Sequence, residues 1–573
     1  MRFGVSMKKL VLFLTVAMSL SAFADTRKLS KELQGKLSNR TVDVIIQYKV
    51  APSALHRSRI ASGNGTVRTD LSFIRSLHVS MPASALAVLA ADPDVAYIAP
   101  DRPLHSTSSG WSTEVLDYHS ETVNAPVAWG QNLDGSHIGV AVIDSGIINI
   151  PDLQKRVVYS QDFTGGNSTG DSYGHGSHVA GIIGGNGTQS TGTGYSYTFR
   201  GIAPNVDLVN LRVLDQNGQG TDSSVIAAIQ TAIQLKNKYK IRVINLSLGR
   251  PVFESYQVDP LCQAVEAAYE AGIVVVVAAG NDGRDNSQNT NGYGTITAPG
   301  NDPYVITVGA MNTMGTPSRA DDEITTYSSK GPTPIDHIVK PDLVAPGNRI
   351  ISLYTAGLNL SVLYPGNEIP NSLYQKNGNS TASPTYYVMS GTSMAAPMVS
   401  GAVALMLQKC QQLTPDQVKA RLMKTSSKTF PSYTSYTDPT TGITYTSQYD
   451  IFTVGAGYLD IQAALSNRDL SSGVAKSPTA QYDSKTNSVY FVKDSSALWG
   501  SSALWGSSAL WGSNVFVGSQ SALWGSSALW GSSALWGSSI THGFSALWGS
   551  SALWGSSTAD GGETTKILIN GEN

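Results

Sequence analysis

The chain has 573 residues, which at about 100–200 residues per domain is enough for about three to five domains. Its 39 Lys and Arg residues nearly balance 41 Asp and Glu residues. The net charge of −2 excludes a strongly basic nucleic-acid binder and a polyacidic solvating chain. Cys262 and Cys410 are the only cysteines, which excludes a disulfide framework and a cysteine-based zinc site.

Residues 1–24 are typical of a signal peptide. They combine a basic start, a mostly apolar run over 10–20 that is too short to span a bilayer, and an Ala22-Phe23-Ala24 cleavage signal before Asp25. A retained anchor is the alternative interpretation, but no later stretch has 18 uninterrupted apolar residues. The sequence therefore predicts a secreted, extracellular protein without a transmembrane anchor and leaves association with the cell surface open.

Residues 25–105 have the pattern of a small α+β unit. Strands are expected over 42–48, 76–81 and 95–98, where apolar and β-branched residues alternate or cluster. A helix is expected over 82–91, a stretch rich in Ala and Leu that opens on a proline.

Residues 120–466 alternate short apolar strands with helical stretches. This alternation predicts an α/β fold with a doubly wound, mostly parallel sheet and helices on both faces. The strands are expected at 138–143, 207–211, 243–246, 273–278 and 304–308, and two of the helices at 223–238 and 261–271.

Residues 495–557 repeat the hexapeptide Ser-Ser-Ala-Leu-Trp-Gly. Because six is even, a strand would place the tryptophans of an unbroken run on one side, whereas a helix would scatter them over three faces. The period favours an extended or solenoid arrangement, with low-complexity disorder as the alternative. The tail is interpreted as a spacer, as a contact to polysaccharide or the cell surface, or as a removable extension. Its tryptophans are Trp499, Trp505, Trp511, Trp524, Trp530, Trp536, Trp548 and Trp554.

Three residues supply the groups of a nucleophilic hydrolase. Asp144 closes an apolar strand, His175 opens a glycine-rich helix, and Ser393 is expected to be the N-cap of an apolar helix running to about Lys409. A serine hydroxyl needs a base within reach, which a histidine supplies, and a buried carboxylate fixes the tautomer of that histidine. The order Asp, His, Ser disfavours an α/β-hydrolase, in which the serine comes first. A metal site at His175 and His178 lacks a third ligand, so His178 is expected to be a helix-packing residue.

The sequence resembles the subtilisin-like serine proteases, or subtilases, in three motifs: VAVIDSG (140–146), GHGSHVAG (174–181) and SGTSMAAP (390–397). The resemblance covers about residues 40–466. It implies a secreted serine endopeptidase that acts on proteins or peptides. The implied catalytic residues are Asp144, His175, Ser393 and, in the oxyanion hole, Asn281, and the implied substrate-binding residues are Leu248, Gly249, Ala278 and Gly280.

The resemblance also implies a propeptide in front of the catalytic domain. An inhibitory propeptide that assists folding and acts in cis would be cut off near residues 105–109. The expected order is a signal peptide (1–24), the propeptide (25–107), the catalytic domain (108–468), a linker (469–494), the repeat tail (495–557) and a C-terminal segment (558–573).

The implied chemistry requires no cofactor. A structural calcium ion is left open, because Asp152 matches a frequent calcium ligand of the family but the loop over 184–200 has no carboxylate to complete the site. Arg250 is expected to narrow one side of the substrate pocket, Gly280 to leave a pocket wall open, and an insertion over 352–387 to cover or extend the cleft. The sequence does not show whether the two cysteines meet.

Two other functions compete with the protease. A non-catalytic surface or adhesion protein would carry the tryptophan array on an inert α/β domain, but pseudoenzymes usually lose at least one catalytic residue and this set is complete. An esterase or amidase on the same scaffold would act on small esters without proteolysis. The leading hypothesis is a serine endopeptidase that is made as a zymogen and processes itself.

Overall fold

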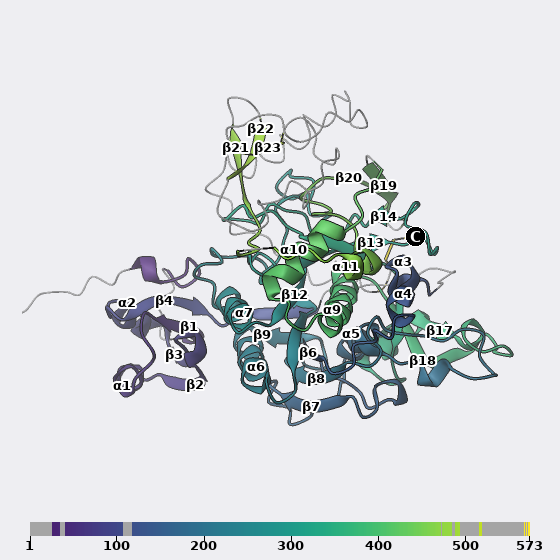
Figure 1. Ribbon diagram of the computed structural model, residues 1–573. Helices are drawn as coiled ribbons and strands as arrows, with labels where there is room; N and C mark the ends of the chain where they lie inside the picture. Colours follow the sequence, from purple (N-terminus) through teal and green to yellow (C-terminus); the bar gives the residue numbers. More distant parts are fainter. Residues whose placement is uncertain are drawn as a thin grey trace, which may run out of the picture. The chain divides into compact units, whose positions relative to one another are not determined.

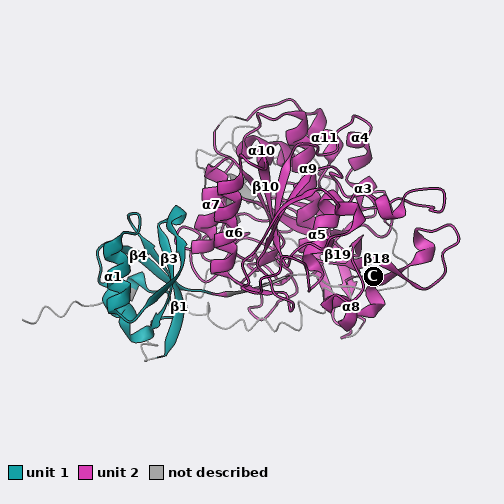
Figure 2. Ribbon diagram, turned by 90° about the horizontal axis from the view of Figure 1, so that it is seen from below, with its two compact units in different colours: residues 1–101 teal, residues 102–573 magenta. Residues whose placement is uncertain are grey.

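The computed structural model describes residues 26–34, 40–106, 117–431, 433–439, 441–471, 473–483, 488–492 and 515–517, together with residues 567, 569, 571 and 572. The chain divides into two compact units, residues 1–101 and 102–573 (Figure 2). The predicted signal peptide lies outside the described residues. No helix within the described ranges is both long enough and apolar enough to cross a membrane.

The first unit is an antiparallel sheet in the order β2-β3-β1-β4, with two α-helices in a β-α-β-β-α-β succession. The strands expected over 42–48, 76–81 and 95–98 are present as β1, β3 and β4. Its elements are η1 (Thr26–Lys28), β1 (Thr41–Tyr48), α1 (Ala54–Ser62), β2 (Thr66–Leu71), η2 (Ser72–Ile74), β3 (Ser76–Pro82), η3 (Ala83–Ala85), α2 (Leu86–Ala90) and β4 (Val95–Pro100).

Two elements of the first unit were not expected from the sequence, and one is shorter than expected. Only His56 and Ile60 of α1 are buried, so this helix has almost no apolar stripe. The edge strand β2 is half exposed along most of its length and polar in sequence. The helix expected over 82–91 is a 3-10 turn, η3, followed by the short helix α2.

The second unit is built on an eight-stranded sheet in the order β14-β13-β12-β10-β6-β8-β7, with β15 also paired to β13. All neighbours are parallel except β13 and β14, which confirms the mostly parallel α/β sheet. The strands are β6 (Gly139–Asp144), β7 (Val157–Asp162), β8 (Asp207–Arg212), β10 (Ile241–Leu246), β12 (Val274–Ala278), β13 (Ile306–Asn312), β14 (Glu323–Ile324) and β15 (Leu343–Pro346).

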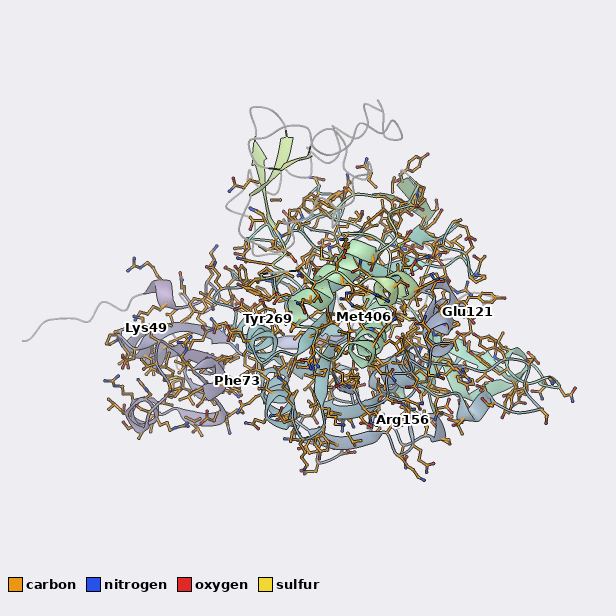
Figure 3. All side chains as sticks on the ribbon, viewed as in Figure 1. Lys49, Phe73, Glu121, Arg156, Tyr269 and Met406 are labelled. Atoms are coloured by element: carbon orange, nitrogen blue, oxygen red, sulfur yellow. The ribbon has the colours of Figure 1, made fainter. Side chains whose placement is uncertain are left out.

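Helices cover both faces of this sheet. Figure 1 shows α6 and α7 on one side and α5 and α9 on the other, and α9 packs against β10, β12 and β13. Met406 on α9 is fully buried and lies well inside the unit (Figure 3). The helices are α3 (His119–Thr122), α4 (Ala125–Trp129), α5 (His175–Gly184), α6 (Asp222–Leu235), α7 (Pro260–Glu270), α8 (Asn359–Leu363), α9 (Thr392–Lys409), α10 (Pro415–Thr425) and α11 (Ile461–Ser466).

Small sheets and turns surround this core. The strands β5 (Pro103–Ser106), β9 (Gln219–Thr221) and β11 (Leu248–Gly249) form one three-stranded sheet, and β16 (Ile350–Leu353), β17 (Glu368–Pro370) and β18 (Ala382–Met389) form another. The strands β19 (Tyr433–Thr437) and β20 (Thr444–Gln448) form a hairpin. The remaining 3-10 turns are η4 (Pro151–Leu153), η5 (Thr188–Ser190), η6 (Pro365–Asn367) and η7 (Asn371–Leu373).

The stretch predicted as a linker, 469–494, is attached to the second unit. Ala480 N–H donates to the His337 carbonyl at 2.8 Å, and Ser477 Oγ donates to the buried Asp342 carboxylate at 2.6 Å. This stretch contains β21 (Thr479–Asp483) and β22 (Ser488–Val492). β23 (Val515–Val517) runs parallel to β22 in a repeat unit that has lost its tryptophan. The tryptophan-bearing units lie outside the described residues, so their extended arrangement stays a prediction.

Candidate active site

Asp144 is the last residue of β6, a strand in the interior of the sheet. β6 runs between β8 and β10, and all of its residues are buried. The chain then turns at Gly146, whose φ of +114° suits glycine and where a side chain would meet the backbone of Gly170 at 2.9 Å. The carboxylate therefore lies at the carboxyl edge of a parallel sheet, which is where sites form in such folds.

His175 is the first residue of α5, and its ring is paired with Asp144. The distance from His175 Nδ1 to Asp144 Oδ1 is 2.7 Å, and neither side chain is exposed to solvent. Because an ionised carboxylate only accepts hydrogen bonds, Nδ1 carries the proton and Nε2 is left with its lone pair. His175 Nε2 has no hydrogen-bond partner among the described residues. This arrangement leaves Nε2 able to accept a proton.

Asp171, which the sequence analysis missed, holds the turn that carries His175. Its two carboxylate oxygens accept hydrogen bonds from Tyr173 N–H, Gly174 N–H, Ser177 N–H and the Ser177 hydroxyl, at 2.7 to 3.0 Å. Ser145 Oγ adds a fifth bond at 2.9 Å, which links this turn to the residue after Asp144. Asp171 thus fixes the start of α5 against the end of β6. Its place four residues before His175 is the signal that could have found it.

Ser393 lies in the first turn of α9 and is not the N-cap, so that prediction is wrong. The N-cap is Gly391, whose φ of +140° lets the chain turn sharply into a helix that begins at Thr392. Ser393 Oγ donates to the Ser247 carbonyl at 3.0 Å. The hydroxyl lies at the amino end of an 18-residue helix, where backbone N–H groups lack helical acceptors.

Ser247 explains how α9 accommodates a proline. Pro397 has no N–H to donate to the carbonyl of Ser393, four residues earlier. The Ser247 hydroxyl donates to that carbonyl instead, at 2.8 Å. Ser247 therefore holds both the backbone and the side chain of Ser393, a role that sequence reasoning missed.

Asn281 follows β12 and contacts the residue next to Ser393. Its Oδ1 accepts from Thr392 N–H at 3.0 Å and from Thr392 Oγ at 3.1 Å, which fixes the orientation of the carboxamide. Asn281 is 3% exposed, and its Nδ2 has no partner among the described residues. A buried N–H donor beside a serine nucleophile is what an oxyanion hole requires.

The strand β5 lies between β9 and β11, the strand that contains Leu248 and Gly249. β5 pairs antiparallel with β11, where Gly249 is opposite His105, and with β9, where Gln219 is opposite the same residue. Arg102, just before β5, forms two 2.7 Å hydrogen bonds with the Glu254 carboxylate, and both side chains are buried. The pairing places residues 103–106 in the second unit.

The predicted role of Arg250 is wrong. Its guanidinium is buried and paired with Asp222 at 2.9 Å and with Asp259 at 2.8 Å. The side chain is therefore held by these two carboxylates and does not narrow a pocket. These carboxylates raise the pKa of Arg250 well above its ordinary value, against the lowering effect of burial.

The predicted substrate-binding residues lie at the ends of β11 and β12. Leu248 and Gly249 form β11, and Ala278 ends β12. Gly280 does not leave an open wall on its Cβ side, because a Cβ there would meet Ser329 Oγ at 2.7 Å and Thr297 Cγ2 at 2.8 Å. A Cβ at Gly249 would likewise meet Thr297 Oγ1 at 2.7 Å. The two glycines thus make room for Thr297, a neighbour that the sequence analysis did not identify.

The insertion over 352–387 packs against the loop that carries His175. Asn359 N–H and Leu360 N–H donate to the carbonyls of Ser172 and Tyr173, each at 3.0 Å. The insertion therefore supports the loop that carries His175 from outside the sheet.

His178 packs its helix α5 against the strands β16 and β18, as expected of a helix-packing residue. Its Nε2 bonds to the Ile350 and Tyr387 carbonyls at 3.1 and 3.0 Å, and burial lowers its pKa to about 3. Cys262 and Cys410 are both free, so they do not pair.

Asp152, the candidate calcium ligand, is buried beside the loop over 184–200. Its Oδ1 accepts from Gln189 N–H at 2.7 Å, and its Oδ2 has no partner in the described part of the chain. Across that same part, no group of three or more His, Cys, Asp or Glu side chains is placed to hold a metal. One carboxylate is a poor match for the six to eight oxygen ligands of calcium, so the calcium ion stays open and no role is derived for it.

We expect Asp152→Asn to raise the thermal stability of the protein at pH 8 and to leave it nearly unchanged at pH 4. Burial raises the pKa of Asp152 to about 6, whereas an unfolded Asp has about 3.9. Between these two pKa values the unfolded chain releases the Asp152 proton that the native chain keeps. The free energy of unfolding of the wild type therefore falls by up to about 3 kcal/mol as the pH rises. Melting curves in a Ser393→Ala background, which cannot digest itself, measure the difference. A calcium-dependent loss of stability in the variant would instead show that Asp152 binds calcium.

Comparison with known proteins identifies the family of the chain. Residues 135–455 match the family model described as the subtilase family. The chain is 34% identical to the serine protease AprX of Bacillus subtilis over 70% of this chain and 78% of that one. It is 31% identical to subtilisin E of the same organism over 73% of this chain and 94% of that one.

A solved structure shares the fold. Fervidolysin from Fervidobacterium pennivorans, described as a keratinolytic enzyme related to subtilisin, matches with a TM-score of 0.57 and 23% identity, over 81% of this chain and 66% of that one. This structural similarity shows the fold alone, whereas the family model and the relatives in sequence show the family. The chain therefore belongs to the subtilase family and is a serine endopeptidase.

Proposed function

We propose that this endopeptidase is secreted, uses Ser393, His175 and Asp144 as its catalytic triad, and is made as a zymogen with residues 25–107 as its propeptide. The observation that carries the proposal is the buried 2.7 Å pair of His175 and Asp144, which leaves Nε2 without a partner among the described residues. That pair is the base of a serine hydrolase with its tautomer fixed. Residues 108–468 would be the catalytic domain.

In the first step, Ser393 Oγ leaves the Ser247 carbonyl, turns to His175 and attacks the carbonyl carbon of the scissile peptide bond. The Oγ proton passes to His175 Nε2, and the negative charge of Asp144 stabilises the imidazolium that forms. The carbonyl oxygen becomes an oxyanion that accepts hydrogen bonds from Asn281 Nδ2 and the Ser393 N–H.

The imidazolium then gives its proton to the leaving amine, the C–N bond breaks, and an ester on Ser393 remains. Water attacks that ester as His175 Nε2 takes one of its protons, and the carboxylic acid leaves with Ser393 Oγ protonated again. No cofactor takes part in these steps.

The position of β5 supports the zymogen. An extended peptide substrate would pair with β9 and β11 as an added strand, and residues 103–106 already do so. This strand runs into the predicted cut near residues 105–109. A segment that fills the substrate edges and is then cut would inhibit in cis until it leaves. The apolar run and cleavage signal over residues 1–24 support secretion.

The proposal is tested with a fluorophosphonate, which reacts with activated serines, and with casein as substrate. We expect one adduct on Ser393, complete loss of casein hydrolysis after labelling, and no adduct on Ser393→Ala. Labelling at another serine would contradict the assigned nucleophile. Hydrolysis of a small ester without casein hydrolysis would favour the esterase alternative.

A further inference from the structure

The segment that follows the repeat, residues 567–572, returns to the second unit. Ile567 is 3% exposed and belongs to the main core cluster, and Ile569 packs against the same cluster. Gly571 N–H donates to the Ile567 carbonyl at 3.2 Å, which turns the chain toward Glu572. Glu572 is charged in its ordinary form yet only 4% exposed, so something must compensate the burial of its carboxylate.

Two residues receive the Glu572 carboxylate. Arg284 Nη2 lies 2.8 Å from Glu572 Oε1. Thr326 N–H donates to Oε1 and Oε2 at 2.9 and 3.1 Å, and the Thr326 hydroxyl also donates to Oε1. A cation and two further donors on one carboxylate form a site that recognises an anion.

Arg284 is itself held in place by other parts of the unit. Its guanidinium lies over the rings of Tyr436 and Tyr445, 5.1 and 4.8 Å from their centroids, and its Nε donates to Thr326 Oγ at 3.0 Å. Asp438 lies 3.5 Å from Nη1. Burial lowers the pKa of Arg284, but Glu572 and Asp438 outweigh this effect and raise it above its ordinary value. The cation is thus oriented by two rings of the β19–β20 hairpin.

The backbone of the segment is also recognised. Asn348 Nδ2 donates to the Glu572 carbonyl at 2.6 Å, and Asn348 Oδ1 accepts from Glu572 N–H at 2.9 Å. Gly571 has a φ of +54°, and a Cβ there would lie 2.7 Å from Ser390 Oγ. The pocket therefore selects glycine followed by glutamate.

We propose that the described residues Ile567, Ile569, Gly571 and Glu572 form a clasp that occupies a carboxylate-binding pocket made by Arg284, Thr326 and Asn348. The clasp ties together the two loops that carry the catalytic groups. Arg284 is three residues after Asn281, and Ser390 is three residues before Ser393. The clasp contacts both Arg284 and Ser390, although the catalytic mechanism uses neither of these two residues. This inference goes beyond the proposed function and does not depend on which serine is the nucleophile.

The test compares Glu572→Gln with Glu563→Gln, which makes the same change of charge nine residues earlier, in full-length chains that also carry Ser393→Ala. We expect the melting temperature to fall by about 3–5 °C for Glu572→Gln, because the buried Arg284 loses the nearer of its two carboxylate partners. For the control we expect the melting temperature to stay within about 1 °C. Hydrogen exchange of peptides covering 567–572 should speed up at least tenfold only in the Glu572 variant.

A double-mutant cycle isolates the ion pair. Arg284→Gln also removes the contacts to the two tyrosines, so it should lower the melting temperature more than Glu572→Gln does. The double variant should have a melting temperature close to that of Arg284→Gln alone. The clasp is refuted if the effects of Glu572→Gln and Arg284→Gln on the melting temperature add up in the double variant. It is refuted as well if the Glu572 and Glu563 variants have equal melting temperatures and equal hydrogen-exchange rates. It is also refuted by a wild-type dimer that Glu572→Gln dissociates, because the occupant would then come from a second copy of the chain.

Discussion

Ser393→Ala is expected to leave residues 25–107 attached to the chain and to lower peptide hydrolysis about a million-fold, the size of the loss known for subtilisin itself. Without Oγ there is no nucleophile for the first step, although the oxyanion donors and the buried His175–Asp144 pair stay in place. The intact masses of wild type and variant, both expressed without residues 1–24, measure the processing. We expect the wild type alone to lose the mass of the propeptide.

Ser400→Ala is the matched control, because Ser400 is a buried serine of the same helix whose hydroxyl donates to Asn245 Oδ1 at 2.8 Å. It should be processed like the wild type. Loss of the propeptide from Ser393→Ala in pure protein would contradict the assignment of the nucleophile. If wild type and variant both keep the propeptide, self-cleavage is refuted and an external activator is required.

Asn281→Ala is expected to lower kcat about 100- to 1,000-fold while KM changes little, again the range known for subtilisin. Asn281 Nδ2 has no partner among the described residues, so its hydrogen bond is gained when the oxyanion forms. An interaction made mainly in the transition state changes kcat and kcat/KM together. Steady-state kinetics on a fluorogenic peptide separate the two constants.

Two further variants sharpen this prediction. Asn281→Asp keeps the acceptor for Thr392 but removes the donor, so it should be at least as defective as Asn281→Ala. Asn286→Ala changes an exposed asparagine five residues later and should keep full kcat. A rise in KM at constant kcat for Asn281→Ala would assign the residue to substrate binding and contradict the oxyanion role.

Much of the second unit could be predicted because its strands are buried on both faces. β6 and β12 are short apolar runs whose every residue is inside, and such runs stand out in a sequence. The helix α1 and the edge strand β2 of the first unit lack that signal, since most of their side chains are at least partly exposed. The hydrophobic pattern of the sequence therefore predicted buried strands such as β6 and β12 but did not predict α1 and β2.

Asp144, His175, Ser393 and Asn281 were named from the sequence because there the residue type is itself the chemistry, and the structure pairs His175 with Asp144 and Asn281 with Thr392. Residues that act through tertiary contacts were not named in this way. Ser247 supplies the bond that Pro397 cannot make, and nothing in the local sequence connects the two. The role predicted for Arg250 was wrong for the same reason. The carboxylates that pair with its guanidinium belong to α6 and to the N-cap of α7.

The attachments on either side of the repeat tail change what proteolysis can do to it. Residues 477–480 bond to the second unit before the repeats begin, and the clasp at 567–572 bonds to it after they end. A single cut between residues 484 and 566 would leave each product anchored at its own end. The nicked molecule would migrate as one species in a native gel and as two fragments after denaturation. Shedding the tryptophan repeats would take two cuts, one on each side of them.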